Sequence, residues 1–299
     1  MPRYPESVET AIRSYVRDME RKGGYSRTTI MSTIRTGNAV FRIAGMFQEG
    51  SIPRNVTADT VRKTLEYMKE NYTVSTQKLY FFYLKELMRA SDNHAYEDIR
   101  VVYPTDIRPN VDWLSLDDAM TLLRTELPSL ERMIVVLGLC HGLRRAEMEH
   151  LHTYDIHEKE KFITVLGKGS GGGKLRSVHF HPIFHTVFKD WMDTRSRLAQ
   201  QSREDESDNA LLVYKKGVKL KGYSRQTIAT IVEKLSKRLG IKFSCHTLRR
   251  TFGREMYHSG VRIETIAKIM GHSSTEMTLR YIGINLEDQA IAMNQFILR

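Results

Sequence analysis

The sequence predicts a mainly α-helical protein with a small β-sheet, arranged as two domains. Four segments within residues 1–103 repeat apolar residues at the spacing of amphipathic helices. Residues 104–112 contain two prolines and little apolar periodicity, which is typical of a linker. Beyond Asp155, two apolar runs flank a glycine-rich turn and predict paired strands. We therefore expect a helical domain over residues 1–103, a linker over 104–112, and a mixed α and β domain over 113–299.

Composition sets the first limits on function. A chain of 299 residues can form two domains, and its net charge of +11 favours a polyanionic partner, although a merely basic protein is the alternative. Its two cysteines, Cys140 and Cys245, lack C-x-x-C pairing and predict a reducing compartment with buried, unpaired thiols. The first residues lack an apolar signal core, and no run of 18 apolar residues occurs, so we expect neither secretion nor a membrane span.

Residues 1–103 contain the signals of four helices in order. The first helix ends at Gly23, the second begins at Ser26, and the third begins at Thr57. The fourth helix is marked by an apolar set: Leu79, Phe82, Tyr83 and Leu87. On the second helix three arginines fall within about 80° of one another, which is either a binding stripe or an ordinary solvated face: Arg27, Arg35 and Arg42.

The second domain begins with a helix that Ser115 caps, followed by the almost wholly apolar and therefore buried segment 131–139. That segment leads directly to Arg144, and a buried guanidinium needs an anionic partner from the protein or from a substrate. The glycine-rich turn resembles a phosphate loop only superficially, because no G-K-[ST] and no strand–loop–helix pattern occurs. We expect residues 203–209 to form a solvated loop. Four lysines then precede a helix that Ser224 caps: Lys215, Lys216, Lys219 and Lys221.

The stretch from Ser244 to Ile284 carries the residues on which the function depends. His246 and Arg249 are three apart, so a helix that starts near Ser244 presents both on one face. His272 and Tyr281 are nine apart, which would place them on opposite sides of one continuous helix. We therefore expect a break between them.

The sequence offers that break immediately after His272. Ser273 is followed three residues later by Glu276, which is a capping-box pattern and predicts a new helix start. His272, which follows Gly271, then closes the preceding helix, and Tyr281 lies on the next one.

The motifs H-T-L-R-R, G-H with a tyrosine nine residues later, and G-L-R-R-A-E-M upstream resemble the tyrosine recombinase (phage integrase-like) family, which includes Xer- and Cre-like enzymes. The resemblance is strongest over Trp113–Ile284. It implies an N-terminal helical core-binding (SAM-like) domain that grips DNA and a C-terminal α+β catalytic domain. The phrase Y-I-G-I-N-L-E-D-Q resembles archaeal and archaeal-virus members.

The resemblance implies a site-specific DNA recombinase, or integrase, that cleaves and rejoins strands through a covalent 3′-phosphotyrosyl intermediate. Tyr281 would be the nucleophile. Arg144 and Arg249 would clamp the phosphate, and His246 would accept or orient the tyrosine proton. His272 would donate a hydrogen bond to the phosphate. Lys168 would be the general acid, and Glu147 would be a supporting acid. Lys174 is the alternative general acid, since the glycine-rich turn leaves the register open.

We expect no cofactor and no metal, because side chains supply the positive charge. A cluster of six histidines suggests a zinc site as an alternative, but its spacings match no recognised site: His150, His152, His157, His179, His181 and His185.

Double-stranded DNA is the expected partner. The candidate DNA contacts are the arginine stripe, the four lysines and Arg225. The largely apolar residues 286–299 must be buried on their own domain or on a neighbour, and the resemblance favours a neighbour within a tetrameric synaptic complex on DNA. The expected location is the cytoplasm, near the nucleoid, or a host cytoplasm. Two alternatives stay open: a DNA-binding protein of this fold without strand exchange, and a type IB topoisomerase-like relaxing enzyme.

Overall fold

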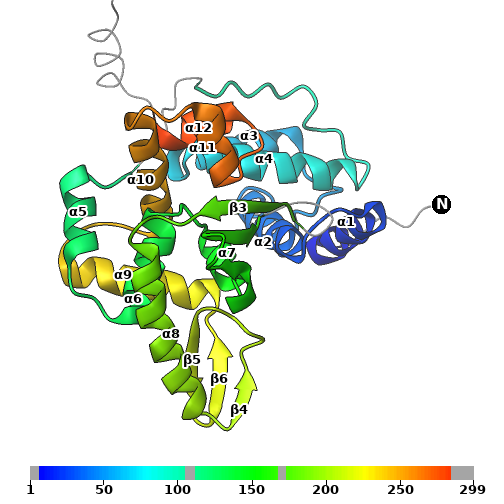
Figure 1. The fold of residues 1–299 in the computed structure, drawn as a ribbon. Coiled ribbons are helices and arrows are strands. Elements are labelled where there is room, and N and C mark those ends of the chain that lie inside the picture. The colour runs from blue at the N-terminus through cyan, green and yellow to red at the C-terminus, as the bar shows by residue number, and fades with distance from the viewer. Residues whose placement is uncertain (1–6, 105–111, 168–172, 284–299) are drawn as a thin grey trace, which may run out of the picture. The chain divides into compact units, whose positions relative to one another are not determined.

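A computed structural model describes residues 7–104, 112–167 and 173–283 of the chain. The chain divides into two compact units, Met1–Ile107 and Arg108–Arg299, and each is treated separately below. The predicted fold class is confirmed, because the described residues are mainly helical and form two small three-stranded sheets (Figure 1). Among these residues, no helix has both the length and the apolar character that crossing a membrane requires.

The first unit consists of four helices, each of which begins after a serine or threonine cap. They are α1 (Val8–Lys22), α2 (Arg27–Ala44), α3 (Ala58–Asn71) and α4 (Val74–Arg89). The cap oxygens of Ser7, Ser26, Thr57 and Thr73 each accept a hydrogen bond from a backbone N–H three residues later. The starts predicted at Ser26 and Thr57 are therefore observed.

Helix α2 lies at the centre of this unit and packs against α1, α3 and α4. A Cβ at Gly37 would lie 3.0 Å from side-chain atoms of Ile12 and Leu87, so a glycine permits this close approach. The buried face of α4 differs from the predicted one. Leu79 and Phe82 are exposed, whereas the predicted Tyr83 and Leu87 are buried, together with Phe81, Leu84 and Met88.

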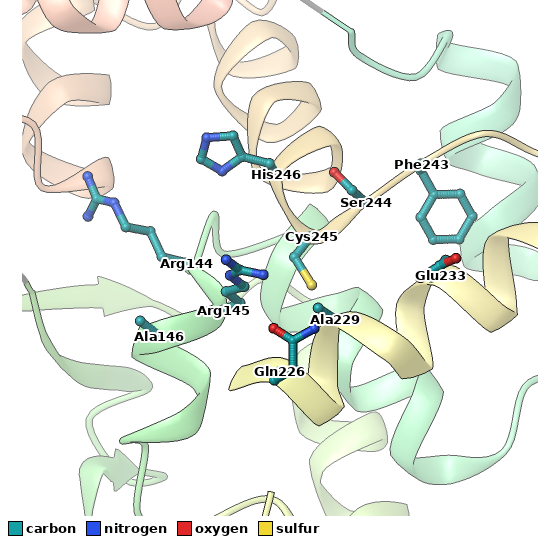
Figure 2. Close-up of a pocket in the computed structure, with 10 residues that line it drawn as sticks. All are labelled: Arg144, Arg145, Ala146, Gln226, Ala229, Glu233, Phe243, Ser244, Cys245 and His246. Carbon is teal, nitrogen blue, oxygen red and sulfur yellow. The ribbon is translucent and has the colours of Figure 1, made fainter. Parts of the chain in front are cut away.

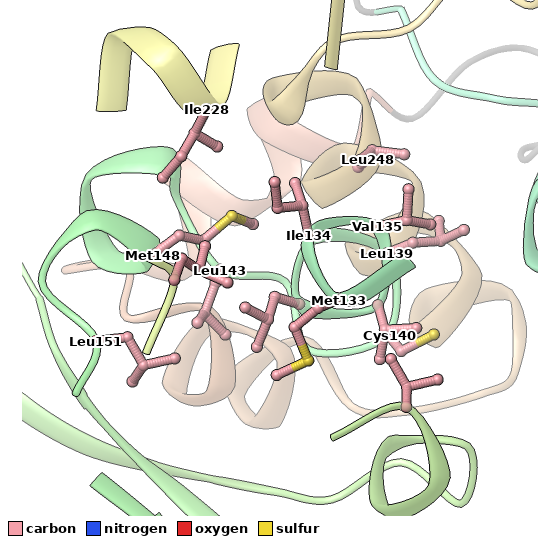
Figure 3. Close-up of a cluster of buried hydrophobic side chains, with 14 of the residues drawn as sticks. Met133, Ile134, Val135, Leu139, Cys140, Leu143, Met148, Leu151, Ile228 and Leu248 are labelled. Carbon is pink, nitrogen blue, oxygen red and sulfur yellow. The ribbon is translucent and has the colours of Figure 1, made fainter. Parts of the chain in front are cut away.

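The second unit surrounds the apolar helix α6 (Ser129–Leu139), whose residues 133–139 are all buried. Besides the short α7 (Arg145–Glu149), which follows it in the chain, helix α6 packs against four others, and Figure 3 shows part of this core. They are α5 (Leu116–Arg124), α8 (Phe184–Gln200), α9 (Arg225–Leu239) and α10 (Cys245–His258). The remaining helical elements are α7 (Arg145–Glu149), the 3₁₀ turn Thr153–Asp155, α11 (Ile263–Met270) and α12 (Thr275–Ile282).

The first sheet has the order β1–β2–β3 and is antiparallel. Its strands are β1 (Ile156–His157), β2 (Phe162–Leu166) and β3 (Leu175–His179). Leu166 pairs with Leu175, and the Gly167 N–H donates to the Lys174 carbonyl at 2.9 Å. Strands β2 and β3 are those that the sequence predicts on either side of the glycine-rich turn.

The second sheet corrects the prediction of a solvated loop over residues 203–209. Its order is β4–β6–β5, with β4 (Glu204–Glu206), β5 (Val213–Lys216) and β6 (Lys219–Gly222). Glu206 forms ion pairs with Lys219 and Lys221, and Glu204 lies 3.3 Å from Lys219. These cross-strand pairs favour a strand where the acidic composition by itself favours a loop.

Two helix ends bring the C-terminal motif residues together. Helix α11 ends at Gly271, whose φ is +63°, and the His272 N–H donates to the Ala267 carbonyl at 2.9 Å. Helix α12 then begins after Ser274, whose hydroxyl accepts from the Met277 N–H at 3.2 Å. The predicted break is present, but the cap is Ser274 and not Ser273. The glycine turn closes α11 through the His272 N–H, so the new helix starts one residue later than predicted.

Candidate active site

Arg249 lies near the start of α10 and is fully buried. Its Nη1 donates to the Gly142 carbonyl, and its Nη2 donates to the Met270 carbonyl and to His272 Nε2, the last at 3.0 Å. Its Nε–H has no hydrogen-bond partner among the described residues. Burial and the neighbouring Arg144 charge lower the pKa of Arg249 to about 10, so the guanidinium stays cationic at neutral pH.

Glu147 is a buried carboxylate that holds arginines from three elements. Arg176 on β3 donates to it from both Nη1 and Nη2 at 2.9 Å, and Arg144 donates from Nη1 at 2.7 Å. Arg249 Nη1 lies 3.6 Å away. Burial by itself would raise the pKa of Glu147. The net effect is a lowered pKa, because burial is outweighed by the hydrogen bonds and charge of Arg176, the backbone N–H of Arg144 and the charge of Arg249. The carboxylate is therefore the anionic partner that the sequence requires for Arg144.

Arg144 precedes α7, and its side chain is 27% exposed, so part of the guanidinium is accessible. Its Nη2 donates to the Gly271 carbonyl at 3.3 Å. Arg176 donates from Nε to the Ile269 carbonyl at 2.7 Å, and a Cβ at Gly271 would lie 3.1 Å from Arg176 Nη1. Both arginines thus tie the end of α11 to Glu147.

His272 is held between two elements. Its Nε2 lies 3.0 Å from Arg249 Nη2, and its Nδ1 lies 2.9 Å from Thr278 Oγ1 on α12. Partial burial and the charges of Arg249, Arg144 and Arg176 lower the pKa of His272 to about 4. The ring is therefore neutral at neutral pH.

Tyr281 on α12 reaches back to α10. Its hydroxyl lies 3.3 Å from His246 Nδ1, and its ring centroid lies 5.1 Å from that of His272. The guanidinium carbons of Arg249 and Arg250 lie 5.6 and 5.3 Å from the ring centroid. Burial raises the pKa of Tyr281 although the arginines oppose it, so the phenol is protonated at neutral pH. Partial desolvation, and the charges of Arg250 and Arg249, lower the pKa of His246, which is then neutral and able to accept a proton.

An open cleft of about 650 Å³ borders this cluster (Figure 2). Arg144 and His246 lie on one side of it, and Gln226 at the start of α9 lies on another. Arg145 also lines the cleft and is exposed. A polyanionic chain that entered this cleft would meet partly exposed cationic groups beside the tyrosine.

The predicted general acid, Lys168, lies outside the described residues. Gly167, which precedes it, is close to the cluster: a Cβ on Gly167 would lie 3.5 Å from Arg176 Nη1 and 3.9 Å from Glu147 Oε1. The alternative, Lys174, is exposed at the other end of the turn.

The candidate DNA contacts differ in their surroundings. Arg27, Arg35 and Arg42 are all exposed on α2. Lys215 and Lys216 are exposed on β5, whereas Lys219 and Lys221 are paired with Glu206. Arg225 lies 3.9 Å from Glu149.

The predicted histidine cluster is dispersed among separate partners. His157 lies 2.9 Å from the Thr164 hydroxyl, His152 stacks on Tyr154, and His185 lies 3.9 Å from Glu158. Within the described parts of the chain, no group of three or more His, Cys, Asp or Glu side chains could hold a metal ion. Cys140 and Cys245 are buried free thiols whose pKa values burial raises to about 12 and about 11.

Arg176 is one member of this site that the sequence reasoning missed, and Thr278 is another. Strand alternation could have found Arg176, because it shares a face of β3 with the buried Val178. An arginine on a buried strand face needs an acidic partner, and Glu147 supplies it.

The first relatives that the sequence matches are tyrosine recombinases. The tyrosine recombinase XerC of Caldanaerobacter subterraneus subsp. tengcongensis is 31% identical over 190 residues, covering 61% of this chain and 50% of the relative. XerA of Pyrococcus furiosus is 30% identical over 154 residues, covering 52% and 50%. The chain thus matches about half the length of each of these relatives.

Solved structures show the same fold. A crystal structure of XerA recombinase aligns over 98% of both chains with a TM-score of 0.54 and 21% identity. The Tn1549 transposon integrase in complex with transposon right-end DNA aligns over 97% of this chain and 99% of that chain, with a TM-score of 0.69 and 18% identity. Residues 114–287, more than half of the chain, match the family model described as the phage integrase family, and they include every side chain of the cluster around Tyr281. The protein in which these arginines, histidines and tyrosine converge belongs to the phage integrase family.

Proposed function

We propose that this protein is a site-specific DNA recombinase that cleaves and rejoins DNA strands through a covalent 3′-phosphotyrosyl intermediate. The observation that carries the proposal is the 3.3 Å distance between the Tyr281 hydroxyl and His246 Nδ1, beside two arginines that Glu147 holds. Transesterification of a phosphodiester needs a nucleophile, cations for the phosphorane and a proton for the leaving oxygen.

Tyr281 is the proposed nucleophile. Because its pKa is raised, it needs a base to remove the phenolic proton as the hydroxyl attacks phosphorus. His246 is within reach and neutral, since its pKa is lowered. The new bond joins the tyrosine oxygen to the 3′ phosphate, and the 5′ oxygen leaves. Reversal of these steps by an incoming 5′ hydroxyl rejoins the strand.

Arg144 and Arg249 are the proposed clamp for the non-bridging oxygens, since a planar guanidinium fork matches two such oxygens. The Nε–H of Arg249, which has no acceptor within the part of the chain that the structure describes, supports this role, because a buried donor without an acceptor favours an incoming anionic oxygen. Glu147 orients both arginines and lowers their mutual repulsion. Lys168 is the proposed proton donor to the leaving oxygen, and the position of Gly167 next to Arg176 supports it.

The assembly and DNA contacts are also proposals. We infer that the unit Met1–Ile107 contacts DNA through Arg27, Arg35 and Arg42, and that exposed Lys215 and Lys216 extend the contact in the second unit. Residues 286–299 lie outside the described residues; their apolar composition supports packing against a neighbouring protomer in a tetramer on DNA. Because the proposed substrate is DNA, we also infer a location in the cytoplasm of the cell or of a host.

The test is trapping of an adduct on nicked duplexes that contain a sequence enriched by binding from random DNA. We expect the wild-type protein to form an SDS-stable covalent adduct, and Tyr281→Phe to bind the DNA within about twofold without forming one. Tyr154→Phe is a matched control, because Tyr154 is 64% exposed and outside the cluster. An adduct with Tyr281→Phe would remove Tyr281 from this role.

The same experiment separates the alternatives. Binding without any adduct from the wild-type protein would favour a DNA-binding protein of this fold. Relaxation of supercoiled plasmid by a single protomer, without strand exchange, would favour a topoisomerase-like enzyme.

A further inference from the structure

Thr278 is a fully buried hydroxyl next to the proposed catalytic cluster. It lies on α12 three residues before Tyr281, so both side chains share one side of the helix. Its Oγ1 is 2.9 Å from His272 Nδ1 and 3.3 Å from the Ser274 carbonyl.

The direction of each hydrogen bond in this chain of groups follows from chemistry. A guanidinium has only donors, so Arg249 Nη2 donates to His272 Nε2, and that nitrogen carries no proton. The ring is neutral, so its one proton lies on Nδ1 and is donated to Thr278 Oγ1. The Thr278 hydroxyl hydrogen is then free to point to the Ser274 carbonyl.

From this geometry we propose that Thr278 is a positioning residue that holds the Nδ1–H of His272 in the tautomer that the Arg249 donor requires, and so keeps the ring in place against Arg249. The role rests on the proposed function. In the DNA-free protein His272 Nε2 accepts from Arg249 and cannot donate to a phosphate. When a phosphate oxygen replaces Nε2 as the acceptor for Arg249, the imidazole proton must move to Nε2 for His272 to donate as well.

Thr278 can satisfy both tautomers because a hydroxyl is both donor and acceptor. It accepts from Nδ1–H in the DNA-free state, and it donates to bare Nδ1 once the proton is on Nε2, giving up the Ser274 carbonyl. Because Thr278 and Tyr281 share α12, delivery of the tyrosine also delivers the group that orients His272. The charged groups around the ring, which act on both tautomers, are Arg249, Arg144, Arg176 and Glu147.

The test compares Thr278→Val, which keeps the shape but loses the hydroxyl, with Thr278→Ser, which keeps the hydroxyl. Nitrogen NMR of ¹⁵N-histidine-labelled full-length protein reports the His272 tautomer, and His272→Gln identifies its signals. In the wild-type protein and in Thr278→Ser we expect one Nδ1–H tautomer with a proton protected from solvent exchange. In Thr278→Val we expect that proton to exchange at least about tenfold faster, or the single tautomer to be lost.

Cleavage supplies the second measurement. At saturating DNA, Thr278→Val should cleave roughly ten- to a hundredfold more slowly, and Thr278→Ser within about threefold of wild type, with DNA affinity unchanged. Thr278→Ala carries the expectations of the valine variant should the latter not fold. An unchanged, protected Nδ1–H in the variants without the hydroxyl would overturn the inference even if the wild type cleaves DNA. If Thr278→Val loses the tautomer while the wild-type protein forms no covalent adduct, the inference about Thr278 stands and the proposed function is refuted.

Discussion

Replacement of Glu147 by glutamine tests whether one buried carboxylate holds the arginine cluster together. Glutamine keeps the shape but removes the charge, and its amide N–H₂ would face the Arg176 or Arg144 donors. Glu147 is only 3% exposed and its partner Arg176 only 10%, so solvent cannot replace the lost charge. Removal of one partner from such a buried pair costs about 3–5 kcal/mol. For a unit of this size that corresponds to a fall in Tm of roughly 6–20 °C.

The assay is the free energy of unfolding from urea curves at pH 7, supported by calorimetry. Glu276→Gln is the matched control, because Glu276 and Arg280 form an ion pair that is more than 70% exposed on both sides. It should cost less than about 0.5 kcal/mol. Glu147→Gln combined with Arg176→Met should lose less stability than the sum of the two single variants, because the two side chains interact directly. A loss below about 1 kcal/mol for Glu147→Gln would refute this account of the cluster.

Four further predictions follow from the same site. Arg144→Ala or Arg249→Ala should lower the single-turnover cleavage rate at least about a hundredfold, since a lost donor to the transition state costs roughly 3 kcal/mol; a rate near wild type would exclude that arginine from the clamp. A 5′-bridging phosphorothioate, which has a better leaving group, should restore cleavage by Lys168→Ala, and rescue of Lys174→Ala instead would identify Lys174 as the general acid. Cleavage should persist in a chelator because side chains supply the positive charge, whereas a loss that a divalent ion reverses would revive a metal role. Burial lowers the pKa of His141 from 6.5 to about 4. As the pH falls, the unfolded state therefore binds the His141 proton before the folded state does. About 3 kcal/mol of folding stability that is present above pH 6.5 is lost by pH 4. His141→Gln should flatten this part of the stability profile in urea titrations, and an unchanged acid loss would contradict the assignment.

Local sequence signals were enough to locate many of the helix starts. Ser26, Thr57, Ser115, Ser224 and Ser244 each cap the helix that the sequence predicts after them. A cap bond joins residues three apart, so the determining contact lies within the predicted segment itself. The same holds for the break between His272 and Tyr281, although its cap lies at Ser274 and the pattern alone indicated Ser273.

Tertiary structure decided which charges meet, since partners that are distant in sequence cannot be identified from spacing. Arg176 and Glu147 are 29 residues apart and join only because β3 passes α7. Glu206 contacts Lys219 and Lys221 only because β4 pairs with β6. This pairing is the reason that residues 204–206 form a strand where the sequence predicts a loop.

The sequence by itself determined the order and the residue types of the candidate site: His246, Arg249, His272 and Tyr281, with Arg144 upstream. Only the fold decided their protonation and access. The burial of Arg249, the neutral His272 and the acceptor role of its Nε2 depend on desolvation and on charges that α7 with its N-cap, β3 and α10 bring together. Desolvation and neighbouring charges shift a pKa according to distances in space, and a sequence pattern does not contain those distances.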